Sequence, residues 1–398
     1  EAGAVAVFPP PHRYFYPLDE AYNLGFTWRG NDFMDHVSGF GIGVRQDLQG
    51  DGRWVPWFNA PPGTKQELGI FWLASRDRGD KLFDRVKAYT HGDRFPEVPG
   101  HKIFTSHYHI EHTTRLIKAR DKSGKPGVPP ALKKPDFVDV FKKAGIQIVH
   151  LAEFHNRLGR LRRDPVKALP LLKTLHEECA RLSGDGFLLL PGEEPNVHLG
   201  GHWISFFPRP VMWVLNRSKD QPFTEEHPQF GRVYHVGSPE DVLKLMEREG
   251  GLMWAAHPRI KSSTGYPDLY RAKPFFKSDR YLGGAWKAMP ADLSKPRLGW
   301  RVLDLLDDTS NWGARKYIVG EVDIFQVDRT TEFYAHANIN YLRLDRIPRF
   351  EEGWESVLKA LRDGAFFIST GEVLMPRFTV GQKASGETLK LDAWGRAK

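Results

Sequence analysis

Residues 103–112 read IFTSHYHIEH, an apolar run of strand length that ends in histidines. His107 and His109 are two positions apart, so on an extended segment both side chains point to the same face. A second apolar run, IQIVHLAEFHN at 146–156, ends in the same way, with Glu153 and His155. Polar groups that collect where strands end indicate a site at one end of a sheet.

Apolar runs alternate with amphipathic stretches from residue 100 onward. DGFLLLPG (185–192) and GLMWAAHP (251–258) are typical of strands, whereas VKALPLLKTLHEECARLS (166–183) and SPEDVLKLMEREG (238–250) are typical of helices. This βαβα order predicts parallel strands and an α/β fold, with a barrel over 100–375.

The two flanks of this region have a different composition. Residues 1–99 are rich in Pro, Gly and aromatic residues, which predicts short strands and turns in place of helices and a small β-sandwich-like N-terminal domain. Residues 376–398 alternate like a β-hairpin, and we expect them to begin a C-terminal β segment that is truncated at Lys398. The chain begins at Glu1 and not at Met, so a bacterial protein that is cytoplasmic and one that is exported after signal removal both stay open.

The composition excludes several classes of protein. The 398 residues are 40% hydrophobic and 27% charged, which is typical of a folded chain. No apolar run approaches the roughly 18 to 20 residues of a membrane span. The net charge of +8 favours an anionic substrate. The basic clusters at 132–135 and 159–167 lack interleaved aromatic residues, so we expect no nucleic-acid partner. The single cysteine, Cys179, excludes an intrachain disulfide, and the oligomeric state is left open.

Histidines and carboxylates recur at the ends of successive strand-like runs, and nine of the 16 histidines lie between 101 and 202. The runs end in these groups: His107 and His109, Glu153 and His155, Glu193 and Glu194, His202, His257, and Asp323. In a (β/α) barrel such strand ends meet at one mouth. Imidazole together with carboxylate suits divalent zinc, manganese or iron, which makes a metal site the simplest reason for the pattern.

The order of these motifs resembles a known family. An HxH after a strand, then PGEE, GGHW, AAHP after a Gly-Gly-apolar run, and GEVDIF occur here in sequence. This order resembles the PHP (polymerase and histidinol phosphatase) superfamily and, within it, the bacterial branch that includes carbaryl hydrolase. The resemblance covers about residues 101–375 and implies a distorted seven-stranded (β/α) barrel that binds two or three metal ions at the carboxyl ends of its strands.

The resemblance also implies a role for each ligand. His107 and His109 would bind one ion, and Asp323 would complete that site. His202 and His257 would bind a second ion. Glu194 would bridge the two ions, with Glu193 as the alternative bridge.

Three positions depart from the family pattern. Ser106 stands beside the HxH in place of an aspartate, Glu153 replaces the aspartate of the second motif, and Phe325 replaces a final histidine. His155 matches a histidine that serves a third ion in the family. Because the final histidine is missing, we expect two ions, unless His112 or His336 substitutes.

The expected chemistry is that of a metal-dependent hydrolase. Two cations a few ångströms apart lower the pKa of a bridging water from about 15.7 to about 7 and stabilise a developing oxyanion. The reaction would be hydrolysis of an ester, carbamate, amide or phosphoester bond. Glu153, His155 and His112 are the candidate donors of the leaving-group proton.

Three cationic residues are candidates for substrate contacts. Arg259 and Lys261 come directly after the His257 motif, and Lys287 lies in AWKAMPADLS. We expect them to bind the anionic part of a small-molecule or glycan substrate. The alternative for Arg259 is an ion pair with a neighbouring acidic residue.

Aromatic residues near the motifs allow a second hypothesis. Tryptophans that stack on a sugar would fit a carbohydrate-binding or carbohydrate-processing protein with an auxiliary or degenerate barrel. Burial of an aromatic side chain contributes about 1.5 to 3 kcal/mol without any ligand, which favours a core role for them. The tryptophans concerned are Trp203, Trp254, Trp286 and Trp312. We interpret His150 and His176, which lie within apolar patterns, as structural.

Overall fold

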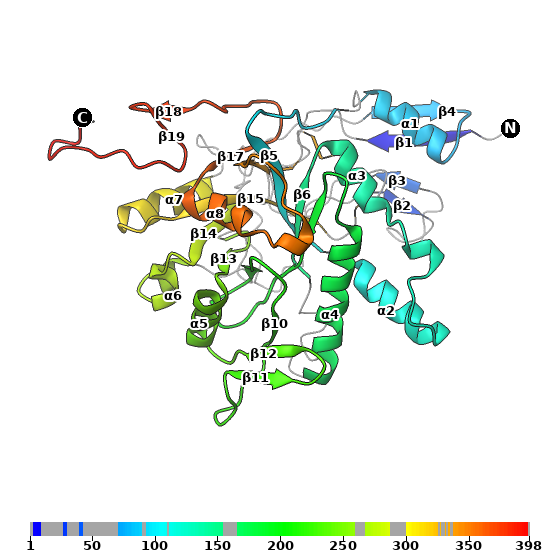
Figure 1. The fold of residues 1–398 in the computed structure, drawn as a ribbon. Helices are drawn as coiled ribbons and strands as arrows, with labels where there is room; N and C mark the ends of the chain where they lie inside the picture. Colours follow the sequence, from blue (N-terminus) through cyan, green and yellow to red (C-terminus); the bar gives the residue numbers. More distant parts are fainter. Residues whose placement is uncertain are drawn as a thin grey trace.

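The centre of the protein is a mixed sheet of 10 strands that curves until its ends nearly meet (Figure 1). The computed structural model describes residues 3–8, 27–29, 40–42, 71–89, 93–109, 111–153, 165–258, 267–286, 300–324, 327, 331, 333–334 and 337–396. The strands of the sheet are β5 (His101–Tyr108), β6 (Ile148–Leu151), β7 (Leu188–Leu190), β8 (Gly192–Glu193), β9 (Trp203–Phe206), β13 (Leu252–Ala255), β14 (Tyr281–Trp286), β15 (Tyr317–Ile324), β16 (Ile339–Arg343) and β17 (Phe366–Ser369).

Most neighbouring strands of this sheet run parallel. β5 lies between β6 and β15, β6 pairs with β7, and β15 is followed by β14 and β13, all in parallel. β9 is antiparallel to both β13 and β8. A parallel bridge between Glu153 and Glu193 then joins the end of β6 to β8. The sheet therefore comes close to closing into a barrel, as the βαβα order predicts.

Two additional strands lie beside the beginning of β5. β16 pairs antiparallel with β5, and β17 pairs antiparallel with β16. With these strands and the reversed β9, the sheet differs from a regular alternation of parallel strands and helices. The expected count of seven strands is therefore not confirmed.

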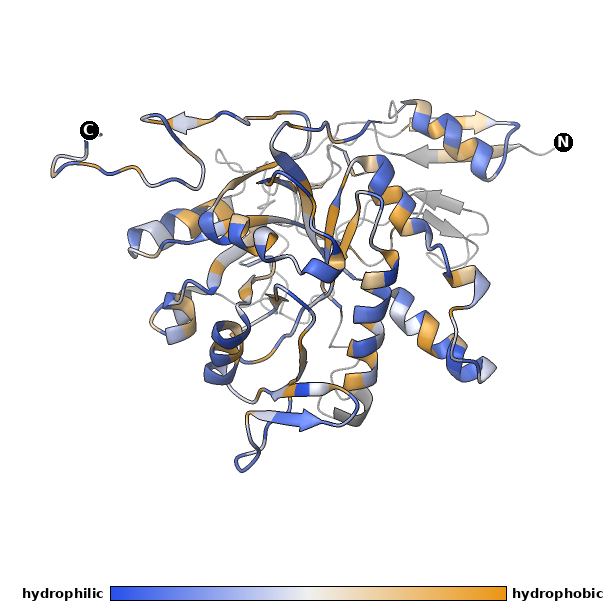
Figure 2. Cartoon of the chain, in the orientation of Figure 1, coloured by the Kyte–Doolittle hydropathy of each residue, from blue (hydrophilic) through white to orange (hydrophobic). Residues whose placement is uncertain are grey.

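Alternate residues of the strands divide into two buried clusters. One cluster contains Phe104, Ile148, Leu188, Ile204 and Trp254, together with apolar residues of α8 (Glu355–Asp363). The other contains their chain neighbours Ile103, Val149, Leu189, Trp203 and Met253, together with residues of α3 (Asp136–Ala144), α4 (Pro165–Leu182) and α5 (Pro239–Glu249). Because α3, α4 and α5 cover the second cluster, the first lies on the inner face of the curved sheet. In Figure 2 the strands of the sheet are coloured mostly as hydrophobic, and the helices are hydrophobic on one side only.

Helix α5 begins and ends at residues that cap it. In α5 the Ser238 side chain accepts a hydrogen bond from the Asp241 backbone N–H at 3.1 Å, and Pro239 occupies the first turn. Gly250 ends the helix with φ 69°, a conformation that glycine adopts without steric cost. The remaining helices are α1 (Asp80–Tyr89), α2 (Glu111–Ser123), α6 (Pro274–Lys277) and α7 (Trp300–Asn311). No described helix is both long and apolar enough to cross a bilayer.

Smaller elements surround the barrel. Between β9 and α5 the chain forms a separate sheet of β10 (Met212–Val214), β11 (Thr224–His227) and β12 (Gly231–His235), which the sequence did not predict. Near the C-terminus, β18 (Thr379–Val380) and β19 (Lys383–Ala384) pair antiparallel, in agreement with the hairpin pattern there. Three short helical turns complete the described elements: Pro130–Leu132, Pro267–Tyr270 and Phe350–Glu352.

The N-terminal region differs in one respect from the expectation of strands and turns. β1 (Ala4–Phe8) pairs antiparallel with β4 (Phe71–Ser75), and β2 (Thr27–Arg29) with β3 (Phe40–Ile42), but α1 is a helix. Its apolar residues Leu82, Val86 and Tyr89 recur at helical spacing, and this signal was hidden by the Pro- and Gly-rich surroundings. Most of residues 1–70 lie outside the described ranges, so the β-sandwich and the domain boundaries stay predictions.

Candidate metal centre

Five of the predicted ligands come together at one edge of the barrel. His107 lies near the end of β5, His109 just after it, Glu194 just after β8, His257 two residues after β13, and Asp323 near the end of β15. All five are buried, with exposed fractions between 0% for His107 and 8% for Asp323. The parallel order of these strands brings side chains that are far apart in the sequence to one place.

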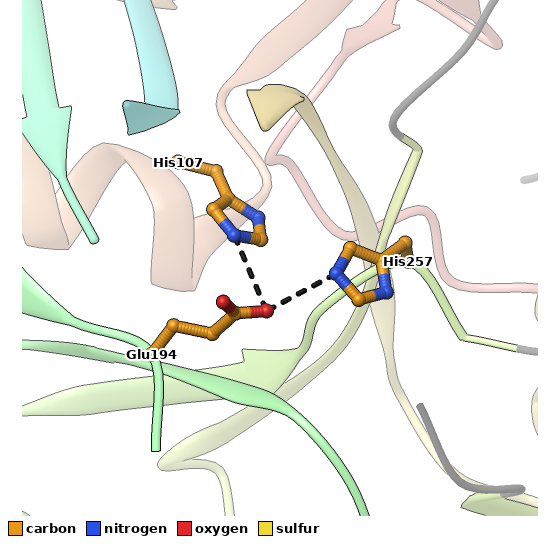
Figure 3. A group of neighbouring side chains, drawn as sticks. All are labelled: His107, Glu194 and His257. Carbon is orange, nitrogen blue, oxygen red and sulfur yellow. Dashed lines mark hydrogen bonds and ion pairs between the residues drawn. The ribbon is translucent and has the colours of Figure 1, made fainter. Parts of the chain in front are cut away.

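Glu194 lies at the centre of this cluster. Figure 3 shows His107 and His257 pointing at its carboxylate from two sides. The Nε2 atoms of His107 and His257 lie 3.3 and 3.1 Å from Glu194 Oε1. Its other oxygen, Oε2, lies 3.5 Å from His109 Nε2. The two oxygens of Glu194 therefore face different imidazoles.

Asp323 provides a second carboxylate to the same histidines. Its Oδ1 lies 3.2 Å from His107 Nε2 and 3.2 Å from His109 Nε2. Its Oδ2 lies 3.4 Å from His257 Nε2. Two groups of three donors therefore have metal-site spacing: His107 with Glu194 and His257, and His107 with His109 and Asp323.

These donors fit a divalent transition metal ion. Donor atoms about 2.0 to 2.2 Å from one ion lie roughly 3.0 to 3.6 Å from one another, depending on the coordination geometry. The distances among the imidazole nitrogens and the oxygens of Glu194 and Asp323 run from 3.1 to 3.5 Å. The Nε2 atom of His107 is buried and has no hydrogen-bond partner, although it faces both carboxylates. A buried ring nitrogen that faces two carboxylates at metal-donor spacing is a position that a bound cation would complete.

Three of the predicted ligands have strained backbones. His107, His257 and Asp323 have φ values of 70°, 30° and 43°, in the left-handed region that residues with a Cβ atom rarely adopt. Each such residue costs of order 1 to 3 kcal/mol, and such residues gather at functional sites. The strain directs these side chains away from the strand alternation and into the cluster.

His202 approaches from the reversed strand. It stands just before β9, and because β9 is antiparallel, its beginning lies at the edge where the other strands end. Its Nδ1 lies 2.8 Å from Glu194 Oε1. With a side chain 16% exposed, His202 is the most exposed of the six predicted ligands. Glu193, the alternative bridge, is part of β8 and pairs with Ser205.

The charges of the cluster shift its pKa values. Burial acts to lower the pKa of His107, but the nearby carboxylates outweigh it and the pKa stands well above its ordinary value. Burial acts to raise the pKa of Glu194, but the imidazoles, His107 first, hold it well below the usual range. Burial lowers the pKa of His109. The Glu194 carboxylate is therefore stabilised as an anion by the positive charge beside it.

Glu321 supports the cluster from behind and was missed in the sequence. It is fully buried on β15, two residues before Asp323. Its Oε2 lies 2.8 Å from His107 Nδ1, and its Oε1 accepts the backbone N–H of His257 at 2.9 Å. The only sequence signal was its place two residues from Asp323 on the same strand.

His150 lies in the inner face of the barrel, below the cluster. Its ring stands 4.1 Å from that of Phe206 and 5.9 Å from that of Trp254, and its Nδ1 bonds to Ser106 Oγ at 2.9 Å. Burial lowers the pKa of His150 to about 3. A Cβ atom at Gly192 would lie 2.0 Å from His150 Nε2, so this close approach requires glycine. The structural interpretation of His150 is supported.

His112 does not join the metal cluster. Its Nε2 lies 2.7 Å from Glu178 Oε2 on α4, and Arg181 Nε donates to the other oxygen of Glu178 at 2.9 Å. Because α2 begins at Glu111, His112 turns toward α4 and away from the strand ends. We therefore assign it neither a metal ion nor the leaving-group proton.

The remaining predicted residues fall into three groups. Glu153 is half-buried at the end of β6, where its backbone pairs with β8. Trp203, Trp254 and Trp286 are buried, which confirms their core interpretation, and Trp312 lies half-buried with the Arg271 guanidinium 5.3 Å from its ring. The following predicted residues lie outside the described ranges: His155, Arg259, Lys261, Lys287 and His336.

Comparisons with known proteins give only distant structural likenesses. No family model and no curated protein matches the chain. A two-domain protein of Bacteroides vulgatus, described as containing a predicted PHP-like metal-dependent phosphoesterase, is similar with a TM-score of 0.36 and 14% identity over 69% of this chain and 67% of its own. PsfC of Pseudomonas syringae is similar with a TM-score of 0.31 and 13% identity over 61% of this chain and 82% of its own. Neither supports the carbaryl hydrolase branch.

Proposed function

We propose that this protein is a metal-dependent hydrolase that uses an activated water on an ester, carbamate or phosphoester bond. The observation that carries the proposal is the buried convergence of His107, His109, Glu194, His257 and Asp323 from four strand ends. A purely structural cluster has no need for three imidazoles around two carboxylates with metal-donor spacing. The fit of the donors to a divalent ion, and not the distant likenesses, supports the assignment.

The ligands divide into two sides with Glu194 between them. On one side His109 faces Glu194 Oε2 and Asp323 Oδ1, and on the other His202 and His257 face Glu194 Oε1. This arrangement supports a bridging role for Glu194 and two ions, with zinc, manganese or iron as the candidates. His107, whose Nε2 faces both Glu194 and Asp323, stands at the junction.

Bound ions would supply Lewis acidity and a water of lowered pKa, which is the chemistry that hydrolysis needs. The residues of the chain hold and orient these groups. Glu321 and the strained backbones fix the ligands in advance, and burial of the ligands keeps bulk water from competing. Glu153 and His155 remain the proposed donors of the leaving-group proton. Arg259, Lys261 and Lys287 remain proposed contacts for an anionic substrate.

Metal analysis together with hydrolysis assays tests the proposal. We expect at least one equivalent of transition metal in the gently purified protein, and hydrolysis of either an aryl phosphate or an aryl ester that stops after chelation and returns with metal. The His257→Ala variant should lose both metal and activity. The control variant His227→Ala removes a histidine from β11, outside the cluster, and should keep both.

Wild-type protein with less than about one equivalent of metal, or a His257→Ala variant with full activity, would contradict the proposal. The relative rates on aryl phosphate and aryl ester decide which bond class the enzyme prefers.

A further inference from the structure

The buried carboxylate of Glu321 contacts two of the proposed ligands, His107 and His257, but it is not one of the clustered donors. Its exposed fraction is 0%. Oε2 accepts from His107 Nδ1 at 2.8 Å and Oε1 accepts from the backbone N–H of His257 at 2.9 Å. The strand register places Glu321 opposite Ser106, so its side chain lies beside β5.

We propose that Glu321 is the positioning residue of the metal centre, which fixes the tautomer of His107 and the backbone of His257 together. This inference rests on the proposed function. It assigns to one side chain the task of aligning ligands from two different strands.

The two ring nitrogens of His107 have different surroundings. A neutral imidazole has one N–H and one lone pair. Glu321 is a hydrogen-bond acceptor at Nδ1, so in the neutral ring that binds a metal ion the proton would stay on Nδ1 and the lone pair would stand on Nε2. Nε2 is the atom that faces Glu194 and Asp323 without a hydrogen-bond partner. Glu321 therefore presents the nitrogen that a metal ion needs.

Glu321 also holds the backbone of His257. Its φ of 30° is strained, and such a conformation persists only where surrounding contacts hold it. The hydrogen bond from the His257 backbone N–H to Glu321 is such a contact, and this N–H belongs to the same residue as the ring. One carboxylate thus holds a strained main chain and a neighbouring ring at the same time.

The substitution Glu321→Gln separates this role from simple packing. Glutamine has nearly the same shape but only one acceptor oxygen beside an NH₂ donor. With two donors facing it, either the His257 N–H loses its acceptor or the amide donates to His107 Nδ1. In the second case the proton of His107 moves to Nε2, which then cannot bind a metal ion.

The experiment measures the affinity of chelated protein for Zn²⁺ alone, by competition with a chromophoric chelator. We expect Glu321→Gln to bind Zn²⁺ about 10- to 100-fold more weakly than wild type. Glu321→Asp keeps both acceptor oxygens on a shorter side chain and should recover part of the affinity, with a loss of about three- to tenfold. The matched control is Glu249→Gln, because Glu249 is also a buried carboxylate with two donors, Tyr234 and Arg209, but lies on α5.

Unchanged Zn²⁺ affinity of Glu321→Gln overturns the inference, as does an equal loss in Glu249→Gln. If Glu321→Gln does not fold, Glu321→Asp decides in the same way, because wild-type affinity in that variant overturns the role. If wild-type protein itself does not bind Zn²⁺, the proposed function fails and not only the positioning role.

Discussion

His107 and His150 are two fully buried histidines on neighbouring strands of one barrel, and their surroundings are opposite. His107 stands among carboxylates at the strand ends, which raise its pKa against the effect of burial. His150 stands one layer deeper between the rings of Phe206 and Trp254, where burial lowers its pKa to about 3. Burial is common to both, so it does not identify a ligand. The number of anionic oxygens around the ring makes the difference.

We expect the largest effect when the central carboxylate, that of Glu194, is removed. Glu194→Gln leaves a side chain of the same size but removes the anion that four imidazoles face. We expect metal affinity to fall by more than about 100-fold and hydrolysis to be lost, since a ligand and the charge balance both disappear. Metal titration and the hydrolysis assay measure the two effects.

Glu193→Gln is the matched control for this variant. It changes the adjacent carboxylate in β8, which the sequence left open as the bridge. If Glu193→Gln loses the metal and Glu194→Gln keeps it, the central place of Glu194 is wrong.

The second test concerns His150. His150→Ala should keep the metal and lower the free energy of unfolding by about 2 to 4 kcal/mol at pH 7, because a ring in the barrel interior is replaced by a cavity. The folded-state pKa of about 3 lies below the ordinary 6.5, so the unfolded chain binds the proton first. The wild-type contribution is complete above pH 6.5 and is lost as the pH falls toward 3.

Urea denaturation of both proteins at several pH values measures this effect. The difference in the free energy of unfolding should be about 2 kcal/mol smaller at pH 5 than at pH 7, and groups common to both proteins cancel. A difference independent of pH, or a variant without metal, would mean that His150 belongs with the ligands.

The smallest expected effect concerns the pair of His112 and Glu178. Among the described residues, His112 meets this one carboxylate. Burial acts to raise the pKa of Glu178, but hydrogen bonds from Arg181 and His112 hold it at about 2. Glu178→Gln should lower the free energy of unfolding by about 1 to 3 kcal/mol and leave the metal content unchanged. The difference should shrink as the pH falls below 4.5 toward 2, which acid-dependent denaturation measures. Loss of metal in this variant would place His112 at the centre after all.

Much of the centre could be predicted from the sequence because ligands at strand ends leave a local signal. The HxH pattern, PGEE and AAHP each stand after an apolar run, and the fold brings His107, Glu194 and His257 together as expected. The resemblance supplied the order and the roles, which spacing alone does not give. Asp323 and Glu194 were found for the same reason.

The misses have a physical reason as well. Glu321 lies within a strand, and a carboxylate at such a position is expected to face solvent as long as the neighbouring strand is unknown. His112 was a candidate for a third ion and for the leaving-group proton, but the first turn of α2 rotates it toward α4. The chain reversal at β9 also depends on long-range pairing, which no short window of sequence contains.

The bridge between Glu153 and Glu193 is the place where the sheet comes close to closing, and we call it the seam of the barrel. There the Glu153 N–H donates to the Gly192 carbonyl at 2.9 Å and the Glu194 N–H to the Glu153 carbonyl at 3.4 Å. Glu194 is thus both a residue of the seam and the carboxylate that the imidazoles surround. A cation bound by Glu194 and by ligands from the other strands would stabilise the sheet at this seam. Amide exchange at Glu153 would therefore slow when the metal binds and become faster after chelation.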